Sequence, residues 1–205
     1  MTYLELKEIL LSEKPSEVFT NEKNKRAKEK ELFNLIPELR MCKGFNQNNE
    51  WHPYDVLEHT YHVIDGIEDK DLILRLAALF HDIGKPYVYT EDENGVGHFK
   101  GHWKVSKDIF LKFAKKCHLD SKTRELVSRL IYYHDLSFAP EKETDDKNKK
   151  HVATAIDRSR FTKSEIINLY RLKKADILAQ NPKFHEEVLD RNESEEEEWL
   201  MTKTR

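Results

Sequence analysis

The sequence predicts an all-α bundle with one small β-hairpin. Apolar residues recur at three- and four-residue spacing in most of the chain, which is the period of an amphipathic helix. Residues 87–99 (YVYTEDENGVGHF) instead carry β-formers on both sides of an Asn-Gly pair, a strong hairpin signal. Hydrophobic residues make up 38% of the chain and charged residues 36%, a balance that favours a folded helical protein with a well-charged surface.

The length and composition favour one folded core in a cytoplasmic protein. With 205 residues we expect an N-terminal helical extension over 1–50, a central domain over 51–182 and a C-terminal acidic helix or tail over 183–205. Two cysteines, Cys42 and Cys117, form no disulfide framework. No secretory signal and no apolar run of about 18 residues is present, so we expect no membrane association. The net charge of −3 supports nucleic-acid binding only weakly.

The periodicity and the breaker residues give the expected order of elements. We expect loops over 40–50 and 141–150, where the sequence lacks periodicity. We expect helices over residues 3–11, 32–36, 54–67, 71–82, 101–117, 120–135, 152–156 and 163–180. Asp120 or Ser121 would cap the helix that follows it, and Asn181-Pro182 would end the last of these helices.

The stretch LILRLAALFHDIGKP, residues 72–86, is the most informative part of the chain. Its apolar helical run ends in adjacent imidazole and carboxylate side chains, His81 and Asp82. We expect Gly84 to allow a left-handed exit from the helix and Pro86 to prevent its continuation. A pair of metal-type ligands would then lie at a helix end.

Six polar residues occupy positions at which a helix should present an apolar side chain to the core. They are His59, His81, Asp82, His102, His134 and Asp176. Burying an unpaired carboxylate costs several kcal/mol, so something must compensate these groups. A divalent cation such as Mn, Fe, Co, Ni or Zn would do so. The alternatives for any single residue are a hydrogen-bonded core histidine and a capping or ion-paired aspartate.

The remaining histidines are interpreted as non-ligands. His98 is the least secure of these assignments, because it lies four residues before His102. The others in this group are His52, His62, His118, His151 and His185.

The order of His59, His81-Asp82 and Asp176 on separate helices resembles the HD superfamily of metal-dependent phosphohydrolases. The segments WHPYDVLEHTYHV, LAALFHDIGKP, HFKGHWKVS and KKADILAQNP are similar to the HD domain of bacterial tRNA nucleotidyltransferases and poly(A) polymerases. The resemblance covers residues 51–182 and implies an HD-domain helical bundle. It implies that His59, His81, Asp82 and Asp176 bind a first metal, and that His102 and His134 bind a second with Asp82 as the bridge.

The resemblance also implies an activity. Asp82 and Lys85 would be the catalytic residues of a phosphatase or phosphodiesterase that uses one or two divalent ions (Mn, Fe, Co, Ni, Mg or Zn) to activate a water molecule. Lys85 would contact a substrate phosphate, although a surface lysine at a helix end is an equally good interpretation. The implied substrate is a phosphomonoester or 2′,3′-cyclic phosphate of a small nucleotide or an RNA end. The alternative is a noncatalytic RNA-binding or regulatory module with a structural metal. The oligomeric state stays open.

Overall fold

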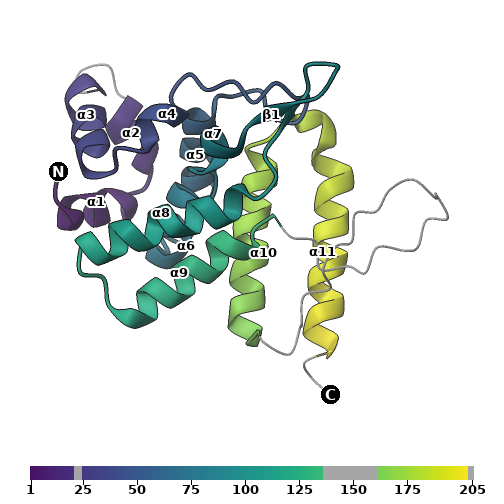
Figure 1. Cartoon of the computed structure of the whole chain (residues 1–205). Coiled ribbons are helices and arrows are strands. Elements are labelled where there is room, and N and C mark those ends of the chain that lie inside the picture. The colour runs from purple at the N-terminus through teal and green to yellow at the C-terminus, as the bar shows by residue number, and fades with distance from the viewer. Residues whose placement is uncertain (21–24, 136–160, 203–205) are drawn as a thin grey trace.

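The computed structural model describes residues 1–20, 25–135 and 161–202, which form a helical bundle with one small hairpin, as the sequence predicts (Figure 1). In chain order the elements are α1 (Tyr3–Leu10), α2 (Pro15–Thr20), α3 (Lys25–Leu35), α4 (Leu39–Cys42), α5 (Val56–Asp65), α6 (Leu72–Phe80), α7 (Lys85–Val88), β1 (Thr90–Glu91), β2 (Gly97–His98), α8 (His102–Lys116), α9 (Ser121–Tyr133), α10 (Lys163–Leu178), the 3-10 helix η2 (Pro182–Phe184) and α11 (His185–Thr202). The expected loop over 141–150 and helix over 152–156 lie outside the described residues. No helix in the described ranges is long and apolar enough to cross a membrane.

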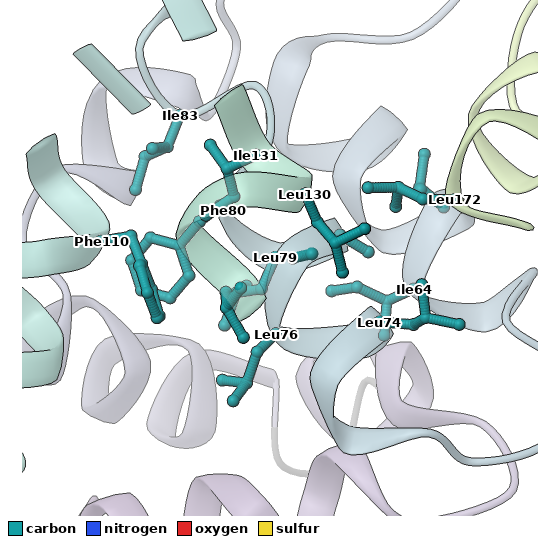
Figure 2. Packing of buried hydrophobic residues seen from close by; sticks show 14 of the residues in the cluster. Ile64, Leu74, Leu76, Leu79, Phe80, Ile83, Phe110, Leu130, Ile131 and Leu172 are labelled. Carbon is teal, nitrogen blue, oxygen red and sulfur yellow. The ribbon is translucent and has the colours of Figure 1, made fainter. Parts of the chain in front are cut away.

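Helix α6 lies at the centre of the hydrophobic core. Every residue from Leu74 to Phe80 is buried, and the small side chains of Ala77 and Ala78 allow neighbouring helices to approach closely. Helices α5, α8, α9 and α10 all pack against it. Figure 2 shows apolar side chains of this core, from α6, the residues after it and the helices packed against it: Ile64, Leu74, Leu76, Leu79, Phe80, Ile83, Phe110, Leu130, Ile131 and Leu172.

A buried arginine attaches the N-terminal helix to this core. The Arg75 guanidinium, on α6, donates hydrogen bonds to the carbonyl oxygens of Leu10 and Ser12 at 2.6 Å each and to that of Ile67 at 2.9 Å. These carbonyls follow the last turns of α1 and α5, where no intrahelical donor remains. The expected helix at the N-terminus is confirmed as α1. The expected loop over 40–50 is wrong at its beginning, where α4 extends to Cys42.

The chain after the His81-Asp82 pair differs from the expectation. Gly84 has a right-handed backbone with φ of −82°, so it supplies no left-handed exit. A Cβ atom at Gly84 would lie 2.5 Å from the carbonyl oxygen of His102 and 2.7 Å from the backbone nitrogen of Ser106. Glycine is therefore needed here because α8 passes so close. Pro86 does not terminate a helix either: it lies in the first turn of α7, where proline needs no hydrogen-bond donor.

The predicted hairpin is present and very short. Thr90 pairs with His98 and Glu91 with Gly97 in an antiparallel register, and Gly95 of the Asn-Gly pair has φ of +75°. The hairpin rests on the loop after α4, because the Gly97 nitrogen donates to the Asn48 carbonyl at 2.9 Å. A short helix replaces the first residues of the expected strand, since 87 and 88 belong to α7.

The last helices close the bundle. Asp120 caps α9 through the backbone nitrogen of Thr123, and Thr162 caps α10 through that of Glu165. Both helices were expected, and Asp120 is the cap of the first. Helix α11 lies alongside α10 (Figure 1), so the C-terminal segment is a helix as far as residue 202.

Candidate metal centre

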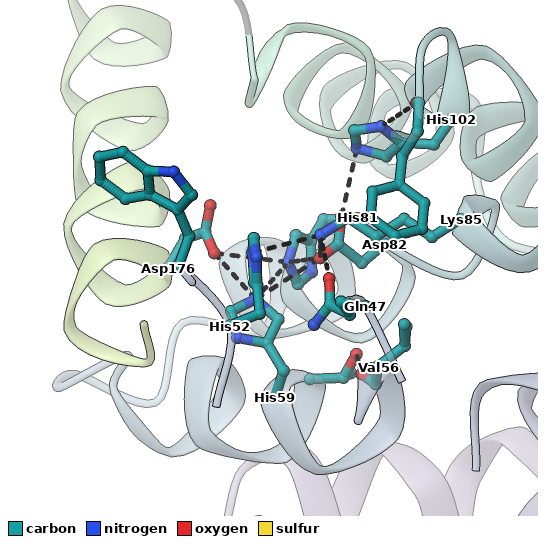
Figure 3. A network of polar contacts seen from close by, with 12 residues as sticks. Gln47, His52, Val56, His59, His81, Asp82, Lys85, His102 and Asp176 are labelled. Atoms are coloured by element: carbon teal, nitrogen blue, oxygen red, sulfur yellow. Dashed lines mark hydrogen bonds and ion pairs between the residues drawn. The ribbon is translucent and has the colours of Figure 1, made fainter. Parts of the chain in front are cut away.

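The six polar residues singled out in the sequence converge on one buried site. Figure 3 shows His59, His81, Asp82, His102 and Asp176 at this site. His59 lies within α5, His81 and Asp82 follow α6, and His102 is the first residue of α8. His134 directly follows α9, and Asp176 is in the last turns of α10. The side chain of Asp176 is 19% exposed, whereas the other five residues are each no more than 4% exposed. Five segments far apart in the chain thus supply one centre.

The potential ligand atoms form two groups of three. His59, His81 and Asp176 make one group, and Asp82, His102 and His134 make the other; within each group the ligand atoms lie within 4.8 Å of one another. The closest contact in the first group is 2.9 Å, between His59 Nε2 and Asp176 Oδ1. In the second group, His102 Nε2 lies 3.2 Å from His134 Nε2.

The carboxylate of Asp82 joins the two groups. Its Oδ2 lies 3.2 Å from His81 Nε2 and 3.5 Å from His59 Nε2. Its Oδ1 lies 3.2 Å from His102 Nε2 and 3.7 Å from His134 Nε2. One oxygen therefore faces each group, which is the arrangement of a carboxylate that can bridge two cations.

Backbone carbonyls orient the imidazole rings. The Nδ1 atoms of His81, His102 and His134 lie 2.7, 2.9 and 2.7 Å from the carbonyl oxygens three residues earlier in the chain. His59 Nδ1 faces the Ala179 carbonyl oxygen at 3.4 Å. These contacts place the ring proton on Nδ1 and leave the Nε2 lone pair directed into the site, as in metal-binding histidines.

In this arrangement, lone pairs of neighbouring ligand atoms face one another. His59 and His81 bring their Nε2 atoms within 3.4 Å, and two such acceptors repel each other unless a proton or a metal cation lies between them. Among the described residues, the buried Oδ1 of Asp176 has no hydrogen-bond partner. Both features fit a divalent metal, which accepts lone pairs and balances carboxylate charge.

The electrostatics favour ionised carboxylates and a neutral His134 ring, whereas burial opposes protonation of His81 but the Asp82 charge raises its pKa overall. Burial opposes ionisation of Asp82, but His81 and Lys85 hold its pKa well below the usual range. Burial likewise opposes ionisation of Asp176, but the neighbouring His59 and His81 rings lower its pKa overall. Burial lowers the pKa of His134, which keeps this ring neutral at pH 7. Ionised carboxylates and a neutral His134 suit metal binding, and a cation bound to His81 would take the place of its proton.

Lys85 belongs to the site as well. Its residue exposure is only 5%, so the interpretation of Lys85 as a surface lysine is wrong. Its Nζ lies 2.7 Å from Asp82 Oδ2 and 5.2 Å from the centroid of the Phe99 ring. Contact between Lys85 and a substrate phosphate stays a prediction.

Two side chains beside the centre, Gln47 and His52, were not predicted to belong to the site. Gln47 accepts a hydrogen bond from Lys85 Nζ at 2.8 Å, and His52 Nε2 lies 3.4 Å from the same nitrogen. Burial and the nearby Lys85 lower the pKa of His52 to about 3, so its ring is neutral. Both residues lie in the loop before α5, where no helical period relates positions in sequence to a face. In the sequence, the one indication that this loop belongs to the site was Trp51-His52-Pro53, which begins a segment similar to the HD domain.

The other histidines in the described residues lie outside the two ligand groups. His98 is exposed on the hairpin, 3.2 Å from Asp92 Oδ2, and so does not join His102 at the centre. His185 faces the Gln180 carbonyl oxygen at 3.1 Å. His52, His62 and His118 also lie outside the groups, and His151 falls outside the described residues.

Comparison with known proteins gives matches in the same region. The profile of the HD domain matches residues 51–181. An A-adding tRNA nucleotidyltransferase of Deinococcus radiodurans is 31% identical over 104 residues, which cover 48% of this chain and 24% of that protein. A CC-adding tRNA nucleotidyltransferase of Thermus thermophilus is 36% identical over 92 residues, which cover 40% of this chain and 21% of that protein. The chain therefore spans less than a quarter of the length of each of these relatives.

Proposed function

The chain belongs to the HD domain family, and on this basis we propose that it is a metal-dependent phosphohydrolase. Its substrate would be a phosphate ester of a nucleotide or an RNA end, either a phosphomonoester or a 2′,3′-cyclic phosphate. The observation that carries the proposal is the position of Asp82, with one oxygen facing each group of ligands. An RNA end is supported by the two relatives, whose names describe tRNA nucleotidyltransferases.

Each group of residues would hold one divalent ion. His59, His81 and Asp176 would bind the first, His102 and His134 the second, and Asp82 both. Bound there, such ions lower the pKa of a water molecule and neutralise phosphoryl oxygens. Imidazole and carboxylate ligands together suit Mn, Fe, Co, Ni or Zn better than Mg, which prefers oxygen.

The surrounding residues would prepare the site for a phosphate. Lys85 places a positive charge beside Asp82 and would contact a phosphate oxygen of the substrate. The backbone carbonyls that accept from the ring Nδ1 atoms keep each Nε2 directed at the centre. The partial exposure of Asp176 favours this side of the centre for entry of the substrate.

The test measures metal content and hydrolysis of p-nitrophenyl phosphate, bis-p-nitrophenyl phosphate and 2′,3′-cyclic nucleotides with added Mn, Co, Ni, Mg or Zn. We expect metal-dependent turnover in the wild type and a loss of about a hundredfold or more in Asp82→Ala, because both ions lose a shared ligand. Asp108→Ala is the matched control, since Asp108 is exposed on α8 outside the centre. Circular dichroism verifies that each variant is folded.

Two results would contradict the proposal. Equal turnover in the wild type and Asp82→Ala would assign the activity to another site or a contaminant. A wild-type protein that holds metal but cleaves none of these esters would favour the alternative, a noncatalytic RNA-binding or regulatory module with a structural metal.

A further inference from the structure

The ammonium group of Lys85 has an acceptor for each of its three protons. Asp82 Oδ2 lies 2.7 Å from Nζ, Gln47 Oε1 lies 2.8 Å away, and His52 Nε2 lies 3.4 Å away. An ammonium has three donors and no acceptor. Of the three partners, only Asp82 carries a charge when His52 is neutral. Figure 3 shows Gln47 and His52 beside the centre, with Asp82 and Lys85 close by.

The surrounding chain holds Gln47 in one orientation. Gln47 is fully buried, and its Nε2 donates to the Tyr54 carbonyl at 3.4 Å, so its Oε1 faces Lys85. The Gln47 carbonyl accepts from Asn49 Nδ2 at 3.0 Å, and a Cβ atom on Gly97 would lie only 2.3 Å from that carbonyl. The hairpin and the loop therefore both restrain the backbone of Gln47.

Asn49 fixes the ring of His52. Asn49 Oδ1 lies 2.8 Å from His52 Nδ1 and also accepts from the backbone nitrogens of Trp51 and His52, at 3.1 and 3.2 Å. An amide oxygen can only accept, so Nδ1 of His52 carries the ring proton. Its Nε2 then presents a lone pair to Lys85. The same loop is attached to the end of α10, because the Asn181 nitrogen donates to the Trp51 carbonyl at 2.8 Å.

We infer that Gln47 and His52 are positioning residues that hold Lys85 with uncharged acceptors so that its charge stays available to a phosphate. A second carboxylate would hold the ammonium equally well but would cancel its charge. An amide oxygen and an imidazole nitrogen fix its position and add no negative charge beyond that of Asp82, whose charge bound metal ions would share. The inference rests on the proposed function, because it assigns Lys85 to the phosphate of the substrate.

The decisive variant is Gln47→Glu, which keeps the size and the acceptor and adds one negative charge. We expect it to weaken binding of inorganic phosphate to the metal-loaded protein by about tenfold, because the added carboxylate would offset the Lys85 charge that attracts the phosphate. With a hydrolysed ester, KM should rise more than kcat falls.

Asn34→Asp is the matched control, because it adds the same charge at an exposed position outside the centre. Calorimetric titration with phosphate and metal analysis are done on all three proteins, the wild type, Gln47→Glu and Asn34→Asp. Equal phosphate affinity in the wild type and Gln47→Glu, at equal metal content, would overturn the inference. Weaker binding in Gln47→Glu alone supports the inference even if no ester is hydrolysed. A lack of hydrolysis would refute the proposed function separately.

A second measurement uses only the wild-type protein and so does not depend on the folding of a variant. Acetylation of lysines by N-hydroxysuccinimide acetate is followed by mass spectrometry of peptides. Lys85, held by three acceptors, should react at least about tenfold more slowly than Lys100, which is exposed two residues before α8. Equal rates would contradict the arrangement on which the inference depends.

Discussion

At the scale of single residues, Gly84 controls how closely α8 approaches the ligand pair. Its nitrogen donates to Ser106 Oγ at 2.9 Å, and its Cα faces the backbone of α8. Helix α8 begins with His102, a member of the second ligand group. The absence of a side chain at one position therefore sets the separation between Asp82 and His102.

Gly84→Ala should damage both stability and metal binding. The added methyl group would overlap backbone atoms of α8 that cannot rotate away, so we expect the free energy of unfolding to fall by about 3 kcal/mol. Urea denaturation measures this loss, and metal analysis should show weaker retention of the ion bound by Asp82, His102 and His134. Gly95→Ala is the control: its Cβ meets no atom within 4 Å, and its φ of +75° should cost only about 1 kcal/mol. Equal losses in the two variants would disprove the packing argument.

The sequence allowed the histidines and aspartates of the centre to be predicted, but not the residues around Lys85. His59 and Asp176 interrupt apolar stripes, so their polarity is anomalous as soon as a helix is assumed. Gln47 lies in a loop, where polar residues are normal and no period assigns them a direction. Gly84 was expected to matter for its backbone angle, yet its role depends on contact with α8, which lies later in the chain.

At the scale of elements, the start of α10 is attached to α9 by one carboxylate. Glu165 forms a capping box with Thr162 and accepts from Arg129 Nε at 2.7 Å. Burial opposes ionisation of Glu165, but hydrogen bonds from Thr162 and the Arg129 charge lower its pKa overall. Because α10 carries Asp176 and α9 precedes His134, the contact between Glu165 and Arg129 helps to fix the position of one ligand group relative to the other.

The contribution of Glu165 should depend on pH. A pKa that is lower in the folded state contributes stability above the unfolded pKa of about 4.3, and this stability is lost as the pH falls through the folded value. Glu165→Gln should therefore lower the free energy of unfolding by about 0.5 kcal/mol at neutral pH, after allowance for solvent screening, and by less near pH 3. Urea denaturation at the two pH values measures the difference. The exposed Glu125→Gln on α9 serves as control, and a difference that did not change with pH would refute this account.

The helices were predictable because apolar periodicity indicates a buried face. The segments that connect them were harder to predict. Pro86 illustrates the limit, since proline is compatible both with the end of one helix and with the first turn of the next. In the structure, Pro86 lies in the first turn of α7, which begins at Lys85 and orients that side chain toward Asp82. The hairpin was found from Asn94-Gly95, whereas its short length reflects packing on the loop after α4.

At the scale of the whole molecule, the centre joins five segments that are distant in the chain. The contact between His59 and Asp176 alone joins residues more than a hundred positions apart in the chain. His102 begins α8 and His134 follows α9, the next helix. An unfolded chain would not hold these ligands in this arrangement. Metal binding should therefore be coupled to the fold, because an ion that binds only the folded state stabilises it.

Loading with metal should raise the melting temperature. At a free metal concentration of about one hundred times Kd, linkage predicts about 2.7 kcal/mol of added stability, which for a chain of this size is an increase of about 5–10 °C. Differential scanning calorimetry of protein treated with a chelator, before and after addition of Mn, Co or Zn, measures the shift. Asp82→Asn should lose most of the shift, because it removes the charge that faces both groups while keeping the shape of the side chain. A shift of the same size in this variant would mean that the ions stabilise the protein at some other place.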